Sequence, residues 1–370
     1  MRRKRLRLRR IAVLLAIIAC ALCLFSASSV VLASEPFELH VIDVGEGLSV
    51  LIESEGHYML IDGGGRYTSS SMISYLKEQG FEQFDCVAVT HYDADHIAGV
   101  IGVLNVFPCD LLLLPDYEGS GDLYQSLAVA AISNGCMIMH GYLGMEIPIG
   151  DAVGEIIGPV REDYPAENDM SLCFIIGYGD KHFLVCGDAE QSSELDLVSY
   201  GADLSADVYV VNHHGSSTSS MDEFLDAVDP EYAIISCGRD NDYGHPTMET
   251  LQRLQNHGVS MYRTDEQGTI IVGSDGYDIW FNKDSSDDWN AGIAAIVPLD
   301  TSSTADDIIT REGDGESGDY RYVCNTNTKK FHYPECDSVK QMNDENRLYT
   351  SLTRDELLAE GYKPCGNCKP

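Results

Sequence analysis

The run Thr90–Gly99 most constrains what this chain can fold into. Within six positions directly after an apolar stretch it carries two histidines and two aspartates: His91, Asp93, Asp95 and His96. A strand that ends there would deliver these side chains on a turn, so that His91 and Asp93 face one ion and Asp95 and His96 another. Mixed nitrogen and oxygen ligands suit Zn²⁺ first, with Mn²⁺ and Fe²⁺ as competitors. The run therefore predicts a binuclear metal site, and a polar loop rich in His and Asp is the alternative.

Composition limits what such a site can serve. The chain has 370 residues, of which 44% are apolar and 34 are glycine, with short alternating or fully apolar runs along it. This predicts a globular α/β protein with one large catalytic domain and a smaller module. The formal net charge is −35, which counts against a protein that simply coats nucleic acid or anionic lipid. Catalysis on phosphodiesters remains open, because divalent metal ions invert the local charge at a site.

The N-terminus has the pattern of a targeting segment. Seven basic residues lie between Arg2 and Arg10, and 23 uncharged, mostly apolar residues follow, ending at Ala33. The small residues there fit a cleavage site, so residues 1–34 are predicted to be a signal peptide. The stretch is also long enough to span a bilayer, which takes about 20 apolar residues, so an uncleaved signal anchor is the alternative. In both cases we expect an extracellular protein, either secreted or anchored in the membrane.

Three zones follow this segment. Residues 35–283 repeat strand-like runs, glycine turns and helix-like runs, as an α/β domain does. Residues 284–318 are rich in Asp, Ser, Thr and Gly, which predicts an acidic flexible linker. Residues 319–370 form a compact unit with balanced charge. Six cysteines of the large domain lack metal-ligand spacing, and we interpret them as buried thiols rather than disulfides: Cys86, Cys109, Cys136, Cys173, Cys186 and Cys237.

Two aspartates stand where predicted strands break into glycine turns. Asp62 follows the strand-like run 58–61, and a carboxylate there can orient a neighbouring metal ligand by hydrogen bonding. Asp188 follows the apolar run 183–186, at a strand end where other strand ends converge, and is placed to bridge two ions. An ordinary turn is the alternative for Asp62, and a helix N-cap is the alternative for Asp188.

Three histidines follow in further turns. His213 and His214 come after the apolar run 208–211, so that one can bind metal while the other faces the substrate. The sequence leaves open which does which, and our assignment gives the metal to His213 and a catalytic role to His214. His245 lies in a constrained turn before Pro246, where its imidazole is placed to donate to a developing oxyanion or a leaving group. A plain loop histidine is the alternative at that position.

The order of these motifs resembles a known family. The series consists of Ile42–Gly47, Asp62–Gly64, Thr90–Gly99, Asn168–Leu172, Gly187–Asp188, His213–Ser216 and Tyr243–Pro246. It is similar to the metallo-β-lactamase-fold hydrolase domain of ComEC-type bacterial DNA-internalisation proteins. The resemblance implies a four-layer αββα sandwich with metals between the strand ends of two sheets. It also implies one or two ions, Zn²⁺ or Mn²⁺, that activate water for phosphodiester hydrolysis.

Some positions depart from the family pattern. Position 93 is Asp where the superfamily usually has His, although the competence branch commonly accepts Asp. The separate third-motif His is absent, and Asn168 and Ser171 near its place are expected to support ligands rather than to bind metal. Glu46 stands where the family usually has Gln. We therefore expect the Asp95–His96 half of the site to hold its ion more firmly than the His91 half, and we do not carry the family's DNA transport over to this chain.

The ligands and the resemblance lead to a preferred function. We expect an exported metal-dependent phosphodiesterase, a nuclease that acts on extracellular DNA through a metal-activated water. Asp95 would be both ligand and proton acceptor, and His214 or His245 would assist the leaving group. The alternatives are a phosphodiesterase for wall polymers or phosphocholine esters, and a non-catalytic protein that binds wall or DNA. Nucleic acid is the expected partner, together with the membrane if the leader is uncleaved, and no protein partner can be inferred.

The C-terminal unit has a metal pattern of its own. A His-x3-Cys pair, His332 and Cys336, precedes a Cys-x2-Cys pair, Cys365 and Cys368. Together they make a closed Cys₃His set, suited to structural Zn²⁺ in a unit too small for a large core, with a disulfide pair as the alternative. The unit is similar to the zinc-binding module named after the Ada DNA-repair protein, where all four ligands are cysteines, so Cys324 is a substitute ligand to consider. As the less acidic part, this unit is the better candidate for contact with a polyanion.

Overall fold

The computed structural model describes residues 37–292 and, towards the C-terminus, residues 322–326, 328–333, 336–340, 342, 347–350, 354, 357, 362–365 and 368. The chain divides into two compact units, Met1–Val297 and Pro298–Pro370. The predicted targeting segment and most of the predicted linker lie outside the described residues. Among the helices of the described part, none has the length and apolar character needed to cross a membrane.

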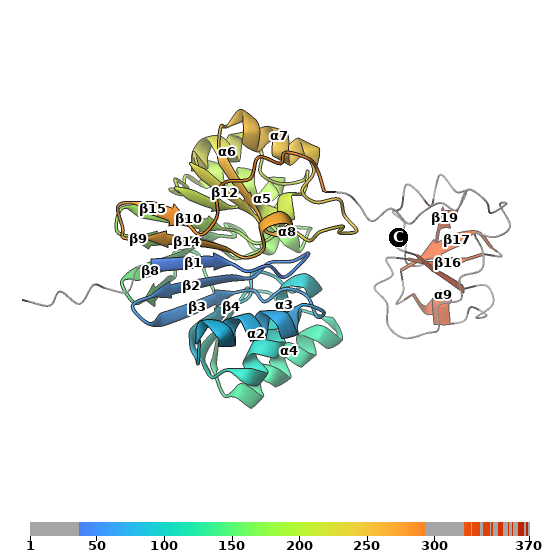
Figure 1. Cartoon of the computed structure of the whole chain (residues 1–370). Coiled ribbons are helices and arrows are strands. Elements are labelled where there is room, and N and C mark those ends of the chain that lie inside the picture. The colour runs from blue at the N-terminus through green and yellow to red at the C-terminus, as the bar shows by residue number, and fades with distance from the viewer. Residues whose placement is uncertain are drawn as a thin grey trace, which may run out of the picture. The chain divides into compact units, whose positions relative to one another are not determined.

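Two β-sheets face each other in the N-terminal unit (Figure 1). The first sheet has eight strands, in the spatial order β15 (Ile279–Phe281), β14 (Ile270–Ser274), β1 (Phe37–Val41), β2 (Val50–Ser54), β3 (His57–Ile61), β4 (Phe84–Ala88), β5 (Cys109–Leu114) and β6 (Met137–His140). The second sheet has seven, in the order β13 (Ser260–Arg263), β12 (Tyr232–Ile235), β11 (Val208–Val210), β10 (Lys181–Val185), β9 (Cys173–Tyr178), β8 (Ala152–Gly158) and β7 (Glu146–Ile149). Strands β3 to β6 run parallel, as do β10 to β13, so the loops that follow them gather at one edge of each sheet.

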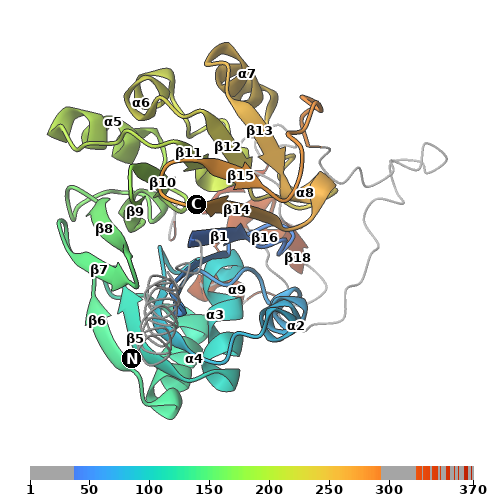
Figure 2. The same cartoon turned by 60° about the vertical axis from the view of Figure 1, so that its left-hand side comes forward.

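Helices cover the outer faces of both sheets (Figures 1 and 2). The first sheet is covered by α2 (Ser69–Gln79), α3 (Ala94–Val106) and α4 (Gly121–Asn134). The second is covered by α5 (Gln191–Tyr200), α6 (Asp222–Val228) and α7 (Met248–Asn256). Short helical segments complete the unit: η1 (Asn168–Met170), η2 (Asn212–Gly215) and α8 (Thr264–Gln267). The predicted four-layer αββα sandwich is confirmed.

Three buried apolar cores hold the four layers together. Strand β4 shows how the sequence builds them, because successive side chains point to opposite faces of a sheet. Cys86 and Ala88 point into the core between the two sheets, while Val87 points into the core under α2, α3 and α4. A strand that is buried on both faces needs an unbroken apolar run, which explains the stretch before His91.

The six cysteines of this unit that lie among the described residues are free thiols. Five of them are buried in the cores: Cys86, Cys109, Cys173, Cys186 and Cys237. Cys136 is half-buried, so the expectation of a buried thiol was wrong for its degree of burial. It lies just before the edge strand β6, where the sheet has no further neighbour to cover it.

The described residues of the C-terminal unit include a small four-stranded sheet and a short helix. Its strands lie in the order β18 (Arg347–Thr350), β16 (Tyr322–Asn325), β17 (Lys330–His332) and β19 (Lys363–Pro364), and the helix is α9 (Asp337–Lys340). Neighbouring residues of β16 lie in different buried groups, Val323 with Cys336 and Cys365, and Cys324 with Phe331. The pleat of the strand therefore separates Cys324 from the cysteines that follow it.

Candidate metal centre

The predicted ligands lie where strands of the two sheets end. Asp62 and His91 follow β3 and β4, which pair in parallel in the first sheet. Asp188 and His213 follow β10 and β11, which pair in parallel in the second. The turn predicted for the opening motif is short, because α3 already begins at Ala94 and carries the next two ligand candidates in its first turn. Residues far apart in the sequence thus meet at one place between the sheets.

Asp188 stands at the centre of this group, and its two oxygens face different histidines. Oδ1 lies 3.2 Å from Nε2 of His96 and 3.5 Å from Nε2 of His214. Oδ2 lies 3.9 Å from Nε2 of His91 and 3.7 Å from Nε2 of His213. Zinc binds such ligands at about 2.0–2.2 Å, so two atoms on the same ion lie at most about 4.4 Å apart. Each oxygen of Asp188 is therefore placed to serve one ion.

The two remaining aspartates of the opening motif divide between these halves. Oδ2 of Asp95 lies 3.4 Å from Nε2 of His214 and 3.9 Å from Nε2 of His96. Oδ2 of Asp93 lies 3.7 Å from Nε2 of His91. The tightest set, with ligand atoms all within 4.8 Å of one another, consists of Asp95, His96, Asp188 and His214. The structure thus places His214, to which we gave a catalytic role, among the candidate ligands beside His96.

Two histidines of the tighter half are held through Nδ1. His96 Nδ1 lies 2.8 Å from Oδ2 of Asp62, a side chain with no exposed surface. His214 Nδ1 lies 3.0 Å from the carbonyl oxygen of Ser236, which can only accept a hydrogen bond. Nδ1 is therefore the donor in both rings, and Nε2 is the ring nitrogen that faces the carboxylates. Asp62 thus lies where its carboxylate can orient the ring of His96.

The histidines of the other half are held in the same way. Thr90 donates its hydroxyl hydrogen to Asp62 at 2.6 Å, so it accepts from Nδ1 of His91 at 3.1 Å. His213 Nδ1 lies 3.2 Å from Oε1 of Glu190. All four imidazoles thus present Nε2 to Asp188. A second partner that fixes the tautomer is what metal-binding histidines generally have.

Buried polar atoms without a partner show that a cation fits here. Among the described residues, Nε2 of His91, His96 and His214 and Oδ1 of Asp188 are buried and make no hydrogen bond. Each unpaired buried polar group costs about 1–3 kcal/mol, so four in contact are unlike an ordinary core. Nitrogen lone pairs and carboxylate oxygens that converge on one point are the donor set of a transition-metal ion.

The electrostatics of the centre point the same way. Burial alone would lower the pKa of His96, but the charges of Asp188, Asp62 and Asp95 outweigh it and raise that pKa well above its usual value. Burial alone would raise the pKa of Asp188, but His96 and His214 hold it well below its usual value. Asp188 is therefore ionised and requires positive charge, which protons on the imidazoles or metal ions can supply.

Asn168 and Ser171, near the place of the absent third-motif histidine, act on other residues of the centre. Asn168 donates from Nδ2 to Glu190 at 3.3 Å, and Glu190 in turn faces His213. The hydroxyl of Ser171 accepts from the backbone N–H of Asp188 at 3.3 Å. Asn168 and Ser171 thus contact Glu190 and Asp188 by hydrogen bonds, and their role as supporting residues stays a prediction.

His245 lies beside the ligands rather than among them. Its ring centroid is 5.6 Å from that of His213 and 6.2 Å from that of His214. Its Nδ1 lies 2.7 Å from Oε1 of Glu46, the residue that departs from the family's usual Gln. The structure therefore brings His245 to the rim of the centre, where it can reach a bound substrate.

The turn that carries His213 and His214 is strained. Both residues have positive φ, 49° and 55°, a conformation that non-glycine residues rarely adopt. Buried Glu194 accepts hydrogen bonds from the side chain of Asn212 at 2.8 Å and from the backbone N–H of Met221 at 2.9 Å. Burial is the main reason that the pKa of Glu194 is raised to about 7. These hydrogen bonds to Glu194 stabilise the turn from which the two imidazoles face Asp188.

Sequence reasoning did not single out four of these supporting residues: Thr90, Glu190, Glu194 and Ser236. The signal for Glu190 was its position two residues after Asp188, in a turn that already carried a candidate bridge. Glu194 could have been noticed as a carboxylate on the apolar face of a short helix, because a buried carboxylate needs donors. Ser236 acts through its backbone carbonyl, which no side-chain pattern reveals.

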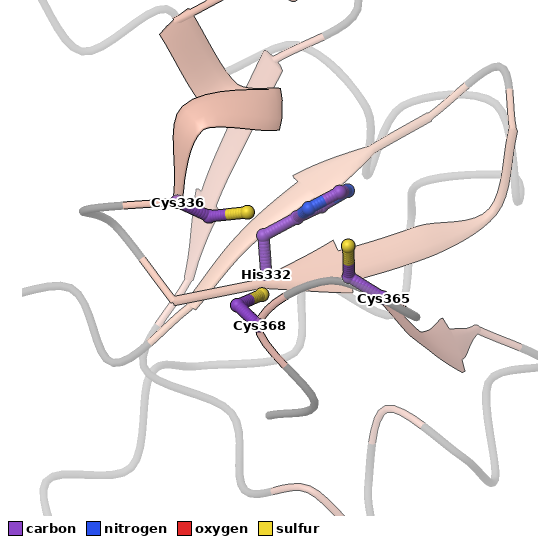
Figure 3. Close-up of side chains that lie close together, drawn as sticks. All are labelled: His332, Cys336, Cys365 and Cys368. Carbon is purple, nitrogen blue, oxygen red and sulfur yellow. The ribbon is translucent and has the colours of Figure 1, made fainter.

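The C-terminal unit contains a second, separate group of metal-binding side chains. Figure 3 shows His332, Cys336, Cys365 and Cys368 pointing towards one another, and their ligand atoms lie within 4.8 Å of one another. His332 ends β17 and Cys365 follows β19, and the two strands pair in parallel. Among the described residues, Nδ1 of His332 is buried and has no partner. Cys324 is not part of the group.

Comparisons with known proteins agree with this geometry. Residues 42–124 and 141–239 match the family model of the metallo-beta-lactamase superfamily. ComE operon protein 3 of Bacillus subtilis is 31% identical over 251 residues, which cover 63% of this chain and 32% of that protein. Competence protein ComA of Neisseria gonorrhoeae is 31% identical over 233 residues, which cover 62% of this chain and 31% of that protein.

The chain spans about a third of the length of these curated relatives. The crystal structure of the metallo-beta-lactamase fold protein YhfI from Bacillus subtilis aligns with a TM-score of 0.44 and 13% identity, over 66% of this chain and 100% of that one. The family-model match and the two competence relatives together identify the superfamily. The N-terminal unit of this chain belongs to the metallo-β-lactamase superfamily.

Proposed function

We propose that this superfamily hydrolase is an exported, metal-dependent phosphodiesterase that cleaves DNA. The observation that carries the proposal is the convergence of four imidazole Nε2 atoms on the two oxygens of Asp188, while every Nδ1 is held by the protein. Such a preformed centre is suited to two ions about 3.5–4 Å apart, the arrangement of two-metal phosphodiesterases. The name of the ComA relative, a competence protein, supports DNA as the substrate.

The residues of the chain have distinct tasks in this mechanism. His96, His214 and Asp95 would hold one ion, and His91, His213 and Asp93 would hold the other, with Asp188 facing both sets. Bound divalent ions, Zn²⁺ or Mn²⁺, would neutralise charge on the phosphoryl oxygens and acidify a water. Asp95 is 35% exposed, so it can also accept the proton of the attacking water. His245, at the rim, faces the departing oxygen.

Aromatic and basic residues around the centre favour a nucleic acid over a small phosphocholine ester. Tyr243 is 61% exposed and stacks on His245, with ring centroids 5.5 Å apart and planes 14° apart. Tyr67 is 99% exposed, and its neighbour Arg66 is also exposed. Both follow Gly65, which lies close to the centre, since a Cβ on Gly65 would be 4.0 Å from the Cα of Asp95. Exposed aromatic rings stack on bases, and arginine contacts phosphate.

The decisive assay uses the full chain with Mn²⁺ or Zn²⁺ and three separate substrates: single-stranded DNA, double-stranded DNA and a phosphocholine ester. We expect metal-dependent cleavage of DNA. A double variant His96→Ala with Asp188→Ala should lose it, while His57→Ala, which removes a histidine paired with Asp85 away from the centre, should keep it. Cleavage of the phosphocholine ester alone would favour the wall-polymer alternative, and no turnover with any metal would favour a binding protein.

We also propose that the Cys₃His group of the C-terminal unit holds a structural zinc ion. Three thiolates and one imidazole form a closed tetrahedral set with no position left for substrate. A unit with two small buried groups has little else to stabilise it. Native mass spectrometry of the full chain, with the N-terminal centre disabled by Asp188→Ala, should detect one remaining zinc ion that disappears in Cys365→Ser.

A further inference from the structure

We propose that Glu46 is a positioning residue for His245, and that the pair manages the proton of the oxygen that leaves the phosphate. This inference rests on the proposed phosphodiesterase function. It concerns one carboxylate at the edge of the centre and the imidazole that it contacts.

Both oxygens of the Glu46 carboxylate are engaged, by two different donors. Oε1 lies 2.7 Å from Nδ1 of His245, and Oε2 accepts the backbone N–H of Gly238 at 3.0 Å. The side chains are largely buried, 16% exposed for Glu46 and 9% for His245. Gly238 permits this approach, because a Cβ there would lie 2.5 Å from the backbone nitrogen of Glu46. The carboxylate is thus fixed at both ends.

His245 is fixed in turn by its own loop. Asn241 accepts the backbone N–H of His245 at 3.0 Å and donates to its carbonyl oxygen at 2.6 Å, while Tyr243 stacks on the ring. With Nδ1 committed to Glu46, the remaining ring nitrogen is Nε2, which has no protein partner within the described part of the chain. The ring lies beside the ligand histidines but outside the ligand group, so Nε2 is available to a substrate held there.

A carboxylate does what an amide in its place cannot. Gln has one acceptor oxygen, so it would satisfy either the Nδ1–H of His245 or the N–H of Gly238 and oppose the other with its own NH₂ group. Only the carboxylate offsets positive charge on the ring. The geometry is that of an acid, an imidazole and a reacting oxygen in sequence, the arrangement that orients histidine in serine hydrolases.

In the proposed hydrolysis, the oxygen of water bonds to phosphorus and passes a proton to Asp95. The bond between phosphorus and the leaving oxygen breaks, its electron pair stays on that oxygen, and the oxygen takes the proton of Nε2 of His245. Glu46 keeps its charge and its hydrogen bond to Nδ1 throughout. Proton exchange with solvent restores Asp95 and His245.

The experiment is a double-mutant cycle on the full chain with Mn²⁺. The substrates are a DNA dinucleotide, whose leaving alkoxide needs a proton, and bis(4-nitrophenyl) phosphate, whose leaving group departs as an anion. On the dinucleotide we expect His245→Ala to lower kcat by about 10²-fold and Glu46→Gln by about tenfold. Glu46→Gln should have no further effect in the His245→Ala background. Both variants should stay near the wild-type rate on bis(4-nitrophenyl) phosphate.

A matched control is Glu38→Gln, which removes another carboxylate that faces a buried histidine, 3.1 Å from His40, and should leave both activities unchanged. Bound metal and melting temperature verify folding. If Glu46→Gln does not fold, His245→Gln supplies the leaving-group comparison. Additive losses in the cycle, or equal losses on both substrates, would overturn the inference. A wild-type chain that cleaves neither substrate would instead overturn the proposed function on which it rests.

Discussion

The candidate metal centre of the N-terminal unit and the Cys₃His group of the C-terminal unit are built in opposite ways. The centre of the N-terminal unit gathers residues from Asp62 to His245, which follow several different strands of two sheets, and another residue holds the Nδ1 atom of each of its candidate ligand histidines. The Cys₃His group lies within positions 332–368, and the Nδ1 atom of its single histidine has no partner in the described part of the chain. A large surrounding fold positions the side chains of the first group, whereas the second group lies in a unit that has little buried structure of its own.

The choice of ligands follows from this difference. Three cores hold the N-terminal unit together, so its centre can use carboxylates and leave Asp93 52% and Asp95 35% exposed to a substrate. The described part of the C-terminal unit has two small buried groups, and the three cysteines of the Cys₃His group lie in or against one of them. Thiolates bind zinc tightly and close the site. A centre with exposed ligands leaves room for a substrate, whereas a site closed by four protein ligands can only stabilise the fold.

Metal removal should separate the two units most clearly. A chelator, or Cys365→Ser, is expected to unfold β16 to β19 while the N-terminal unit stays folded, because structural zinc contributes about 10–16 kcal/mol to small zinc domains. Hydrogen exchange measured by mass spectrometry should show lost protection in residues 322–365 alone. Cys136→Ser, a half-buried thiol outside both groups, is the control. Continued protection of the small sheet without metal would break the comparison.

Substitutions in the open centre should reduce activity rather than folding. Asp188→Ala removes the residue that faces both halves and is expected to lower kcat/KM on DNA by about 10³-fold, since metal ions supply several kcal/mol of transition-state stabilisation. Asp93→Ala touches one half only and should cost less. Elemental analysis, done alongside the rate measurements, should show a loss of two metal ions in Asp188→Ala and of one in Asp93→Ala. An equal loss from both variants would mean that the halves are not independent.

The orienting residues of the centre should tune metal affinity. Asp62 accepts from the backbone N–H of Thr90, from its hydroxyl and from Nδ1 of His96, so it positions two histidines at once. Asp62→Asn leaves a single acceptor oxygen and is expected to weaken zinc binding about 10–100-fold. Competition with a chromophoric chelator gives the dissociation constant. An unchanged constant would show that the strand ends alone hold the imidazoles.

Protons should compete with metal at the open centre. Burial opposes a proton on His214, but Asp188 and Asp95 outweigh it and raise its pKa, as the carboxylates do for His96. A metal ion must displace these protons, so apparent affinity should rise with pH by about tenfold per pH unit for each proton displaced, until the raised pKa values are passed. Calorimetry in two buffers of different ionisation enthalpy counts the released protons. Binding that is independent of pH would contradict this assignment.

Much of the centre was predictable because its signals are local. A strand-like run followed by His91, Asp93, Asp95 and His96 carries both the residue types and their place at a strand end. The contacts that were not predicted join residues that are apart in the sequence. Glu46 and His245 are separated by 199 positions, and Glu190 and His213 follow different strands. No periodicity reports such pairs, because they depend on which loops the two sheets bring together.

The sequence by itself determined the kinds of ligand, their order along the chain and the alternation that places β4 between two cores. Only the tertiary structure decided that His213 and His214 face opposite oxygens of Asp188. The physical reason is the strained turn with φ of 49° and 55°, which rotates two adjacent side chains towards a carboxylate from the neighbouring parallel strand. Such a conformation has no pattern in sequence, because the surrounding fold imposes it.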